Sequence, residues 1–238
     1  MSKFRRGNQR TGNRRPRERE RKRSEFEGVS WIDGKLCTQN LVPGQKVYEE
    51  RLMSKGGVEY RAWDPQRSKP AAAIYNGLNH FPMKKGLKIL YLGFASGTTG
   101  SHFSDIIGPE GIIYGIEISD RVLRESLPLC HKRKNIVPLL MNARKPEDYS
   151  WVESVDFIFA DVAIPDMTEV FIRNAKVFLK DGGFGMLTIK SRSIDVTARP
   201  EDIYKRERVK LEEFFTVTDF VTLDPHERDH GFFVVKRK

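Results

Sequence analysis

The chain has only two cysteines, Cys37 and Cys130, which lie far apart and form no C-x-x-C pair. This scarcity excludes a disulfide framework and a cysteine metal site, and it is typical of a reducing compartment. No apolar run approaches the roughly 20 residues of a membrane-spanning helix, and the N-terminal segment lacks the apolar centre of a signal peptide. We therefore expect a cytoplasmic protein with no membrane segment.

The N-terminal segment has few acidic and few apolar residues. Residues 1–24 hold 11 Lys or Arg against two acids, a net of +9, so the remaining residues carry only +1 of the total of +10. Such a segment buries too little apolar surface to offset the entropy of ordering, and we expect a disordered basic arm. Arginine-rich arms bind nucleic acid through phosphate contacts and counterion release. A tail that only aids solubility is the simpler alternative.

Hydrophobic residues make up 39% of the 238 residues, enough for one well-buried domain. The start of the folded region, residues 25–65, is rich in strand patterns. Asp33-Gly34 stands between alternating apolar residues and predicts a hairpin, and we expect Val47 to Leu52 and Val58 to Ala62 to extend the β structure. Because this segment is too short for much core of its own, it is predicted to be a small N-terminal β subdomain.

From residue 66 to 238 the pattern alternates between strand and helix. Such alternation favours an α/β domain with a mainly parallel, Rossmann-like sheet, and two final strands without a helix between them predict an antiparallel C-terminal edge. Expected strands cover 88–92, 112–116, 136–141, 155–160 and 184–190, expected helices 68–78, 99–107, 120–133, 168–179 and 201–214, and the final hairpin 217–223 with 231–236. Residues 181–183, Asp-Gly-Gly, are expected to end the fourth helix.

The stretch from Lys88 to Glu117 is typical of a nucleotide-cofactor site. Gly93 ends an apolar strand where the backbone must turn, and Gly97 is expected to leave room for a ligand against the main chain. Free amides at the start of the following helix can hold carboxylate or phosphate oxygens. Glu117 closes the next strand at the spacing of an acid that accepts hydrogen bonds from ribose hydroxyls. The glycine spacing differs from the dinucleotide pattern G-x-G-x-x-G, so S-adenosylmethionine (SAM) fits better; a packed strand-to-helix connection is the alternative.

Charged residues follow three of the expected apolar strands: Glu117, Asp161 and Lys190. A charge at the end of a buried strand costs desolvation energy unless it is paired or solvated, and ligands of open α/β sheets bind outside the carboxyl ends of the strands. We therefore expect these residues at one functional edge, although strands must also end in water. The segment His226 to His230 reads HERDH, but Pro225 and a following strand argue against the helix that a zinc motif needs, and no metal site is expected.

Six segments follow one another in a distinctive order: NLVPGQKVYEE, VEYRAWDPQRSKPAAAI, KILYLGFASGTTGSHFSDIIGPEGIIYGIE, DFIFADVAIPD, IKSRSID and LDPHERDHGFFVV. Together they resemble the fibrillarin family in its archaeal form, from about residue 26 to the end, and the ASGTT motif is highly specific. The resemblance implies a class I SAM-dependent methyltransferase fold with a small N-terminal β domain. It also implies 2′-O-methylation of rRNA, and of tRNA, with SAM as the cofactor.

The resemblance also assigns functional residues to positions of this chain. The cofactor contacts of the family fall on Thr98, Thr99, Glu117, Ile118, Asn142, Ala143, Asp161, Val162, Ala163 and Ile164, and its catalytic tetrad falls on Lys69, Asp161, Lys190 and His230. Gly93, at the expected glycine turn, is a further candidate cofactor position. Asn142 stands where the family usually has Asp, Ile164 replaces a Gln, and His226 replaces a Tyr. The tetrad is intact, and Lys190, at a crowded strand end, is expected to be desolvated and to orient or deprotonate the ribose hydroxyl.

Work inside a C/D-box guide ribonucleoprotein is implied as well, with guide RNA, target rRNA or tRNA, a Nop-family scaffold protein and an L7Ae-type kink-turn-binding protein as partners. No RNA-reading module is visible in the sequence, which fits a target chosen by guide base pairing. Two other classes stay open at this point. A subunit with the same fold could bind RNA without catalysis, and an NAD-dependent oxidoreductase would bind NAD more tightly than SAM.

Overall fold

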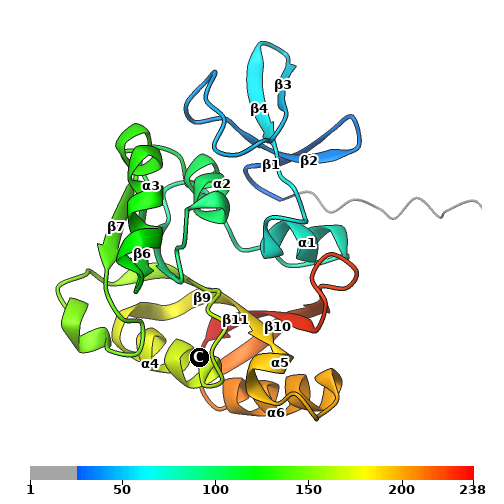
Figure 1. The fold of residues 1–238 in the computed structure, drawn as a ribbon, viewed down its shortest axis with the longest axis vertical. Helices are drawn as coiled ribbons and strands as arrows, with labels where there is room; N and C mark the ends of the chain where they lie inside the picture. The colour runs from blue at the N-terminus through cyan, green and yellow to red at the C-terminus, as the bar shows by residue number, and fades with distance from the viewer. Residues whose placement is uncertain (1–25) are drawn as a thin grey trace, which may run out of the picture.

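The computed structural model describes residues 26–238, and the expected basic arm, residues 1–24, lies outside the described part of the chain. Figure 1 shows a small antiparallel sheet at one end of the molecule and a larger sheet at the other, with α1 and α2 between them. No helix within residues 26–238 combines the length and apolar character needed to cross a membrane.

The small sheet has the strand order β1-β2-β4-β3, and all neighbours are antiparallel. Asp33 and Gly34 form the predicted hairpin turn, with φ of 46° and 77°, as a type I′ turn requires. The strand expected from Val47 to Leu52 is wrong, because the Glu50 carboxylate accepts hydrogen bonds from the amides of Val47 and Tyr48 and bends the chain. The strands are β1 (Val29–Ile32), β2 (Lys35–Gln39), β3 (Leu52–Lys55) and β4 (Val58–Ala62).

The large sheet has the strand order β10-β11-β9-β8-β5-β6-β7. The five strands from β9 to β7 are mutually parallel, whereas β11 is antiparallel to both β9 and β10, so the predicted antiparallel edge is confirmed. The strands are β5 (Lys88–Leu92), β6 (Ile112–Glu117), β7 (Ile136–Leu140), β8 (Val155–Ala160), β9 (Leu179–Lys190), β10 (Phe215–Thr222) and β11 (His230–Arg237).

Helices cover both faces of the large sheet. Successive residues of a strand point to opposite faces, so Tyr91 packs with the residues of α1 and α2, whereas Leu90 and Leu92 pack with those of α4 and α6. The helices are α1 (Lys69–Tyr75), α2 (Thr98–Ile107), α3 (Asp120–Lys132), α4 (Met167–Phe178), α5 (Ser191–Ile194) and α6 (Pro200–Glu212), with a short 3₁₀ helix η1 (Pro146–Tyr149).

The largest differences from the expected bounds are at the end of α1 and at the start of β9, which begins at Leu179 and not at residue 184. Helix α1 stops at Tyr75, before Leu78, because the chain turns at Gly77 with φ of 92°. The expectation that residues 181–183, Asp-Gly-Gly, end the fourth helix is wrong. Helix α4 already ends at Phe178, because the next residue, Leu179, begins β9 and pairs with Val155 of β8. Residues 181–183 therefore lie inside β9.

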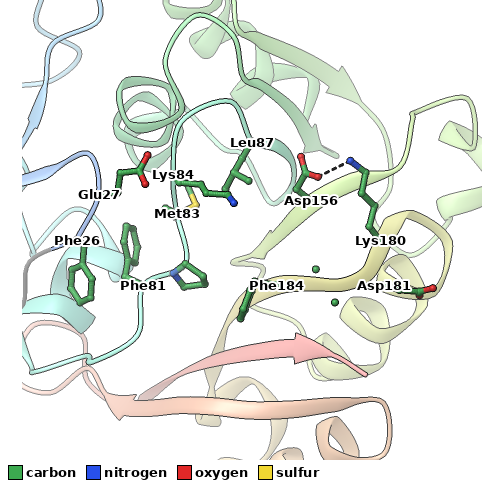
Figure 2. A pocket seen from close by; sticks show the side chains of 13 residues that line it. Phe26, Glu27, Phe81, Met83, Lys84, Leu87, Asp156, Lys180, Asp181 and Phe184 are labelled. Carbon is green, nitrogen blue, oxygen red and sulfur yellow. Dashed lines mark hydrogen bonds and ion pairs between the residues drawn. The ribbon is translucent and has the colours of Figure 1, made fainter.

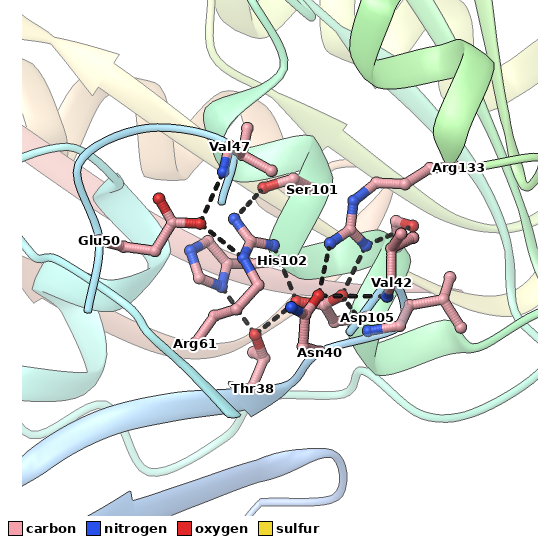
Figure 3. Close-up of polar contacts among 12 residues, drawn as sticks. Thr38, Asn40, Val42, Val47, Glu50, Arg61, Ser101, His102, Asp105 and Arg133 are labelled. Atoms are coloured by element: carbon pink, nitrogen blue, oxygen red, sulfur yellow. Dashed lines mark hydrogen bonds and ion pairs between the residues drawn. The ribbon is translucent and has the colours of Figure 1, made fainter. Parts of the chain in front are cut away.

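A buried polar cluster connects the small sheet to the helices of the large one (Figure 3). Arg61 of β4 contacts Glu50 at 2.7 Å and Asp105 of α2 at 2.9 Å, and none of these side chains is exposed. Asp105 also binds Arg133, which follows α3. Burial of two guanidinium groups is tolerated because each has a carboxylate partner and further hydrogen bonds. The cluster therefore fixes the small sheet against α2.

Candidate active site

The carboxyl ends of β5, β6, β8 and β9 meet at one edge of the large sheet, where ligands of open α/β folds bind. Glu117 is the last residue of β6, Asp161 directly follows β8, and Lys190 is the last residue of β9. All three charged residues that the sequence analysis placed at strand ends therefore lie on this edge.

Lys69 and Asp161 form an ion pair across this edge. The Lys69 Nζ donates a hydrogen bond of 2.8 Å to Asp161 Oδ2, and both side chains are about four-fifths buried, with 22% and 20% of their surface exposed. Burial lowers the pKa of Lys69, but the charge and hydrogen bond of Asp161, and more weakly the charge of Glu227, outweigh burial and raise that pKa. Lys69 is therefore held as a cation.

Lys190 and His230 are opposite each other in the antiparallel ladder between β9 and β11. The residues next to this pair are also hydrogen-bonded, since the Ser191 amide donates to the Asp229 carbonyl at 2.9 Å. The buried His230 ring contacts the Arg228 carbonyl through Nδ1 at 2.7 Å. A carbonyl can only accept, so Nδ1 carries the proton and the lone pair of neutral His230 is on Nε2.

The expected desolvation of Lys190 is wrong, because its side chain is exposed. Lys69 is instead the lysine that burial affects, through its position at the start of α1 against Asp161. The end of α1 contacts the β10–β11 turn, since Asn76 Nδ2 donates to the carbonyls of Thr222 and Asp224 at 2.8 Å. The four tetrad positions thus come from α1, from the end of β8, and from the β9–β11 pair.

The HERDH segment does not form the helix that a zinc motif needs. Residues 226–229 form the turn between β10 and β11. His226 contacts Gln66 at 3.2 Å and its ring lies tilted beside that of Tyr75, whereas His230 bonds to the backbone. The two histidines therefore have separate surroundings.

Gly93 allows the ends of β5 and β8 to approach closely. A Cβ atom on Gly93 would lie 2.5 Å from the Asp161 carbonyl oxygen and 2.7 Å from Val162 Cγ2, and the φ of Gly93 is 83°. Gly97 is also required by the protein itself. A Cβ there would lie 2.5 Å from Leu129 Cδ2, and the φ of Gly97 is 85°.

Glu117 links the glycine turn to the chain beyond β6. Its carboxylate accepts hydrogen bonds from the amides of Ala95 at 3.0 Å and Ser119 at 2.9 Å. Each oxygen keeps a further lone pair, so the carboxylate can still accept from ribose hydroxyls. The next residue, Ile118, is 66% exposed and gives an apolar surface beside that acid. An acid next to an exposed apolar side chain suits the sugar and base of an adenosine ligand.

The remaining cofactor positions lie in the loops after β7 and β8. Asn142 Oδ1 accepts from the Arg144 amide at 3.0 Å, which fixes the side-chain amide close to the backbone. The Ala143 carbonyl accepts from Asn174 Nδ2 at 2.8 Å. After Asp161, the Ile164 amide donates to the Val162 carbonyl at 3.0 Å and closes a tight turn that includes Ala163. The structure thus places these residues on loops at the same edge.

Thr98 and Thr99 begin α2, and Thr99 has partners that the sequence analysis missed. The Ser68 and Thr99 hydroxyls are 2.9 Å apart and both residues are buried. Tyr91 also hydrogen-bonds to Thr99, and burial followed by the nearby charge of Asp161 raises the tyrosine pKa well above its usual value. Ser68 directly precedes Lys69 of the tetrad. The only available signal was this adjacency, since nothing in the sequence pairs residues 68, 91 and 99.

A cavity of about 520 Å³ lies at the opposite end of the strands (Figure 2). Phe26, Phe81 and Phe184 line it together with the Asp156–Lys180 ion pair. Asp156 and Lys180 lie near the starts of β8 and β9, so this cavity is separated from the tetrad by the length of the sheet. The residues that meet at the carboxyl edge carry the better candidate chemistry.

The family model described as Fibrillarin matches residues 20–238. The chain belongs to the fibrillarin family. A relative from Thermococcus onnurineus, named fibrillarin-like rRNA/tRNA 2′-O-methyltransferase, is 54% identical over 222 residues, which are 91% of this chain and 98% of that protein.

Two solved fibrillarin structures share the fold. The Aeropyrum pernix fibrillarin in complex with natively bound S-adenosyl-L-methionine has a TM-score of 0.80 and 49% identity, covering 87% of this chain and 92% of that chain. The fibrillarin of a fibrillarin/Nop5p complex has a TM-score of 0.83 and 39% identity, covering 90% of this chain and all of that chain. The expected class I methyltransferase fold with a small N-terminal antiparallel sheet is therefore confirmed.

Proposed function

We propose that this fibrillarin-family chain transfers a methyl group from SAM to ribose 2′-hydroxyls of rRNA and tRNA. The observation that carries the proposal is the Lys69–Asp161 pair, which lies at the strand ends where the glycine turn and Glu117 also meet. Family membership over residues 20–238 supports the same activity, since the Thermococcus relative is named for it.

SAM would be held by residues of four loops at this edge. The Glu117 carboxylate would accept from the ribose of the cofactor, and exposed Ile118 would pack against its adenine. The start of α2 at Thr98 offers free amides for the methionine carboxylate. SAM supplies an electrophilic methyl group on a sulfonium. The remaining proposed contacts are Gly93, Thr99, Asn142, Ala143, Asp161, Val162, Ala163 and Ile164.

The target hydroxyl must lose its proton as its oxygen gains the methyl group. Lys69 stays protonated beside Asp161, so it donates hydrogen bonds and orients the ribose. The negative charge of Asp161 favours a cationic methyl donor nearby. Holding donor and acceptor in line supplies much of the rate in such a displacement. Lys69 and Asp161 are therefore proposed to position the reactants.

Lys190 and His230 are proposed to act on the hydroxyl from the β9–β11 side. Exposed Lys190 can reach a bound ribose or its phosphate. Nε2 of neutral His230 can accept a proton, because Nδ1 already donates to the Arg228 carbonyl. The hydroxyl proton would pass to Nε2 of His230, while Lys190 holds the ribose or its phosphate in place.

The chain is further proposed to work as the catalytic subunit of a C/D-box guide particle. The fibrillarin/Nop5p complex supports a Nop-family scaffold protein as a partner. Guide RNA and an L7Ae-type kink-turn-binding protein complete the proposed assembly. Guide base pairing would select the target, which accounts for the lack of an RNA-reading module in this sequence.

The test compares Lys190→Ala with Lys55→Ala in a reconstituted particle. Lys55 is exposed and is the last residue of β3, so its replacement removes the same charge away from the carboxyl edge. Lys190→Ala should abolish methyl transfer to the guided RNA while calorimetry shows SAM binding close to that of the wild type. Full transfer by Lys190→Ala would refute its role, and failure of the wild-type chain to bind SAM would refute the proposed function.

A further inference from the structure

A second cavity, of about 320 Å³, is lined by loop and helix residues and not by the residues at the carboxyl ends of the strands. It runs between the loop that follows β2, the beginning of α2, and the side of α3 that faces this loop. Its wall includes Lys46 and Tyr48 from the loop after β2 and Arg67 from the segment before α1. Ser96 from the glycine turn, Thr98 at the start of α2 and Lys132 at the end of α3 also line it.

The exposed charge of this groove is mainly positive. Lys46, Arg67 and Lys132 are exposed, and within residues 26–238 none of them has a carboxylate oxygen within 4.0 Å. Glu125 is the one acidic residue among those that line the groove. Three unneutralised cations against one carboxylate favour an anionic ligand.

Two of the three cations, Lys132 and Arg67, are also held in place by neighbouring side chains. Lys132 Nζ donates to Gln45 Oε1 at 2.6 Å, which holds its ammonium group near the loop across the groove. The Arg67 guanidinium carbon lies 5.7 Å from the centre of the Tyr48 ring, so the aromatic ring supports a planar donor that remains exposed. Arg133, which also lines the groove, is already neutralised by Asp105.

The groove borders the segments that carry the proposed reaction centre, because Arg67 and Thr98 of its wall directly precede Ser68 and Thr99, whose hydroxyls are 2.9 Å apart. Arg67 is two residues before Lys69, and Ser96 and Thr98 belong to the turn and helix start that are proposed to hold the cofactor. The first turn of α2 contains no acidic side chain that would repel a phosphate. A strand whose ribose reaches Lys69 would therefore find the groove one or a few nucleotides away.

We propose that this groove binds backbone phosphates of the RNA strand that carries the target ribose, with Arg67, Lys46 and Lys132 as the phosphate contacts. The inference rests on the proposed function, because it assigns the groove to the substrate of that reaction. RNA is favoured over an acidic protein surface because Arg67 is only two residues from Lys69 and phosphates recur at regular spacing along a strand. Such contacts fix the register of the strand without reading its sequence.

The test replaces two lysines of the groove, Lys46→Gln with Lys132→Gln, and compares them with Lys35→Gln plus Lys55→Gln. Lys35 and Lys55 are exposed at hairpin turns of the small sheet, so both variants lose two charges. Equilibrium binding of target RNA to the guide particle, with its salt dependence, is measured separately from methyl transfer. The groove variant should bind target RNA roughly tenfold or more weakly, and its slope of log K against log salt should fall by about 0.7 for each lysine.

Methyl transfer at saturating SAM should then show a raised KM for target RNA, and Lys46→Arg with Lys132→Arg should restore it. Target RNA binding equal to that of the control would overturn the inference. So would loss of the Nop-family scaffold from the groove variant before RNA is added, because that result assigns the groove to a protein. Absence of methyl transfer by the wild-type particle would instead contradict the proposed function, and the RNA binding measurement would still decide the role of the groove.

Discussion

At the scale of single residues, the Lys69–Asp161 pair decides which charge faces the target ribose. Burial alone would lower the pKa of Lys69, and Asp161 is what raises it. Asp161→Asn should therefore lower the pKa of Lys69, because burial remains while the charge of the partner is lost. NMR titration of the lysine side chain measures the change. Glu153→Gln removes the exposed partner of Lys88; it is the matched control and should leave the pKa of Lys69 unchanged. An unchanged pKa of Lys69 in Asp161→Asn would show that Asp161 does not hold Lys69 as a cation.

His102 gives a prediction about stability and pH. Burial, followed by the charges of Arg61 and Arg133, lowers its pKa well below 6.5. Below pH 6.5 the unfolded chain then binds a proton that the folded chain does not, so stability falls as the pH decreases from 6.5 toward the folded pKa. The slope from this group reaches about 1.4 kcal/mol per pH unit.

His102→Gln should remove this part of the acid sensitivity, because an amide can replace the contacts with Thr38 and Tyr48 but does not titrate. Urea unfolding at several values between pH 7 and pH 5 measures the slope of both proteins. Equal slopes in His102→Gln and the wild type would mean that His102 is protonated in the folded state.

Sequence reasoning placed Asp161 and Lys190 at strand ends because apolar runs that stop at a charge are visible locally. It could not pair Ser68 with Thr99, nor Thr38 with Asp105, since these contacts join segments 31 and 67 residues apart. The exposure of Lys190 was missed for a related reason. The exposure of a strand-end side chain depends on which other segment packs beside it. At Lys190 that segment is the turn before His230, which is distant in sequence and leaves the lysine side chain exposed.

At the scale of elements, the junction of β5 and β8 depends on Gly93. Gly93→Ala should lower SAM affinity and destabilise the fold by about 1–3 kcal/mol, since the added Cβ would lie 2.5 Å from the Asp161 carbonyl oxygen. Gly77→Ala is the matched control, because Gly77 has φ of 92° but open space around it. Calorimetric SAM titration and urea unfolding compare the two. Equal SAM affinity in both variants would show that the close approach at Gly93 is irrelevant to the cofactor.

Most elements could be predicted because their signals are local. Strand β5 ends just before a glycine and β6 ends at an acid, and both have the bounds that their apolar runs indicate, to within one residue. The segment from Val47 to Leu52 has a similar apolar pattern, but the Glu50 carboxylate captures its amides and prevents a ladder. That carboxylate is in turn held by Arg61, a contact that periodicity does not reveal.

At the scale of the whole molecule, the buried cluster of Figure 3 joins the two sheets. Arg61→Met should lower the free energy of unfolding by about 3–5 kcal/mol, because Glu50 and Asp105 would lose a buried partner. Arg208→Met removes an exposed pair with Glu212 one helical turn away and should cost less than about 1 kcal/mol. Urea unfolding measures both changes. Similar losses in the two variants would mean that the cluster contributes little to the attachment of the small sheet.

The uneven charge of the chain leads to a prediction about RNA. Residues 1–24 carry +9 of the total of +10, so their deletion should weaken binding to RNA and reduce the salt dependence of that binding. Filter binding over a range of salt concentrations compares the full chain with the shortened one. An unchanged slope would leave solubility as the role of the arm.

We propose that the tetrad at the carboxyl edge methylates a ribose chosen by a guide RNA. The most direct measurement supplies labelled SAM to a reconstituted guide particle and maps the labelled nucleotide after the guide sequence is changed. We expect one 2′-O-methyl group on the target RNA, at a position that moves with the guide, and none when Asp161 is replaced by Asn. Label on a base, or undiminished transfer by Asp161→Asn, would contradict this role of the tetrad.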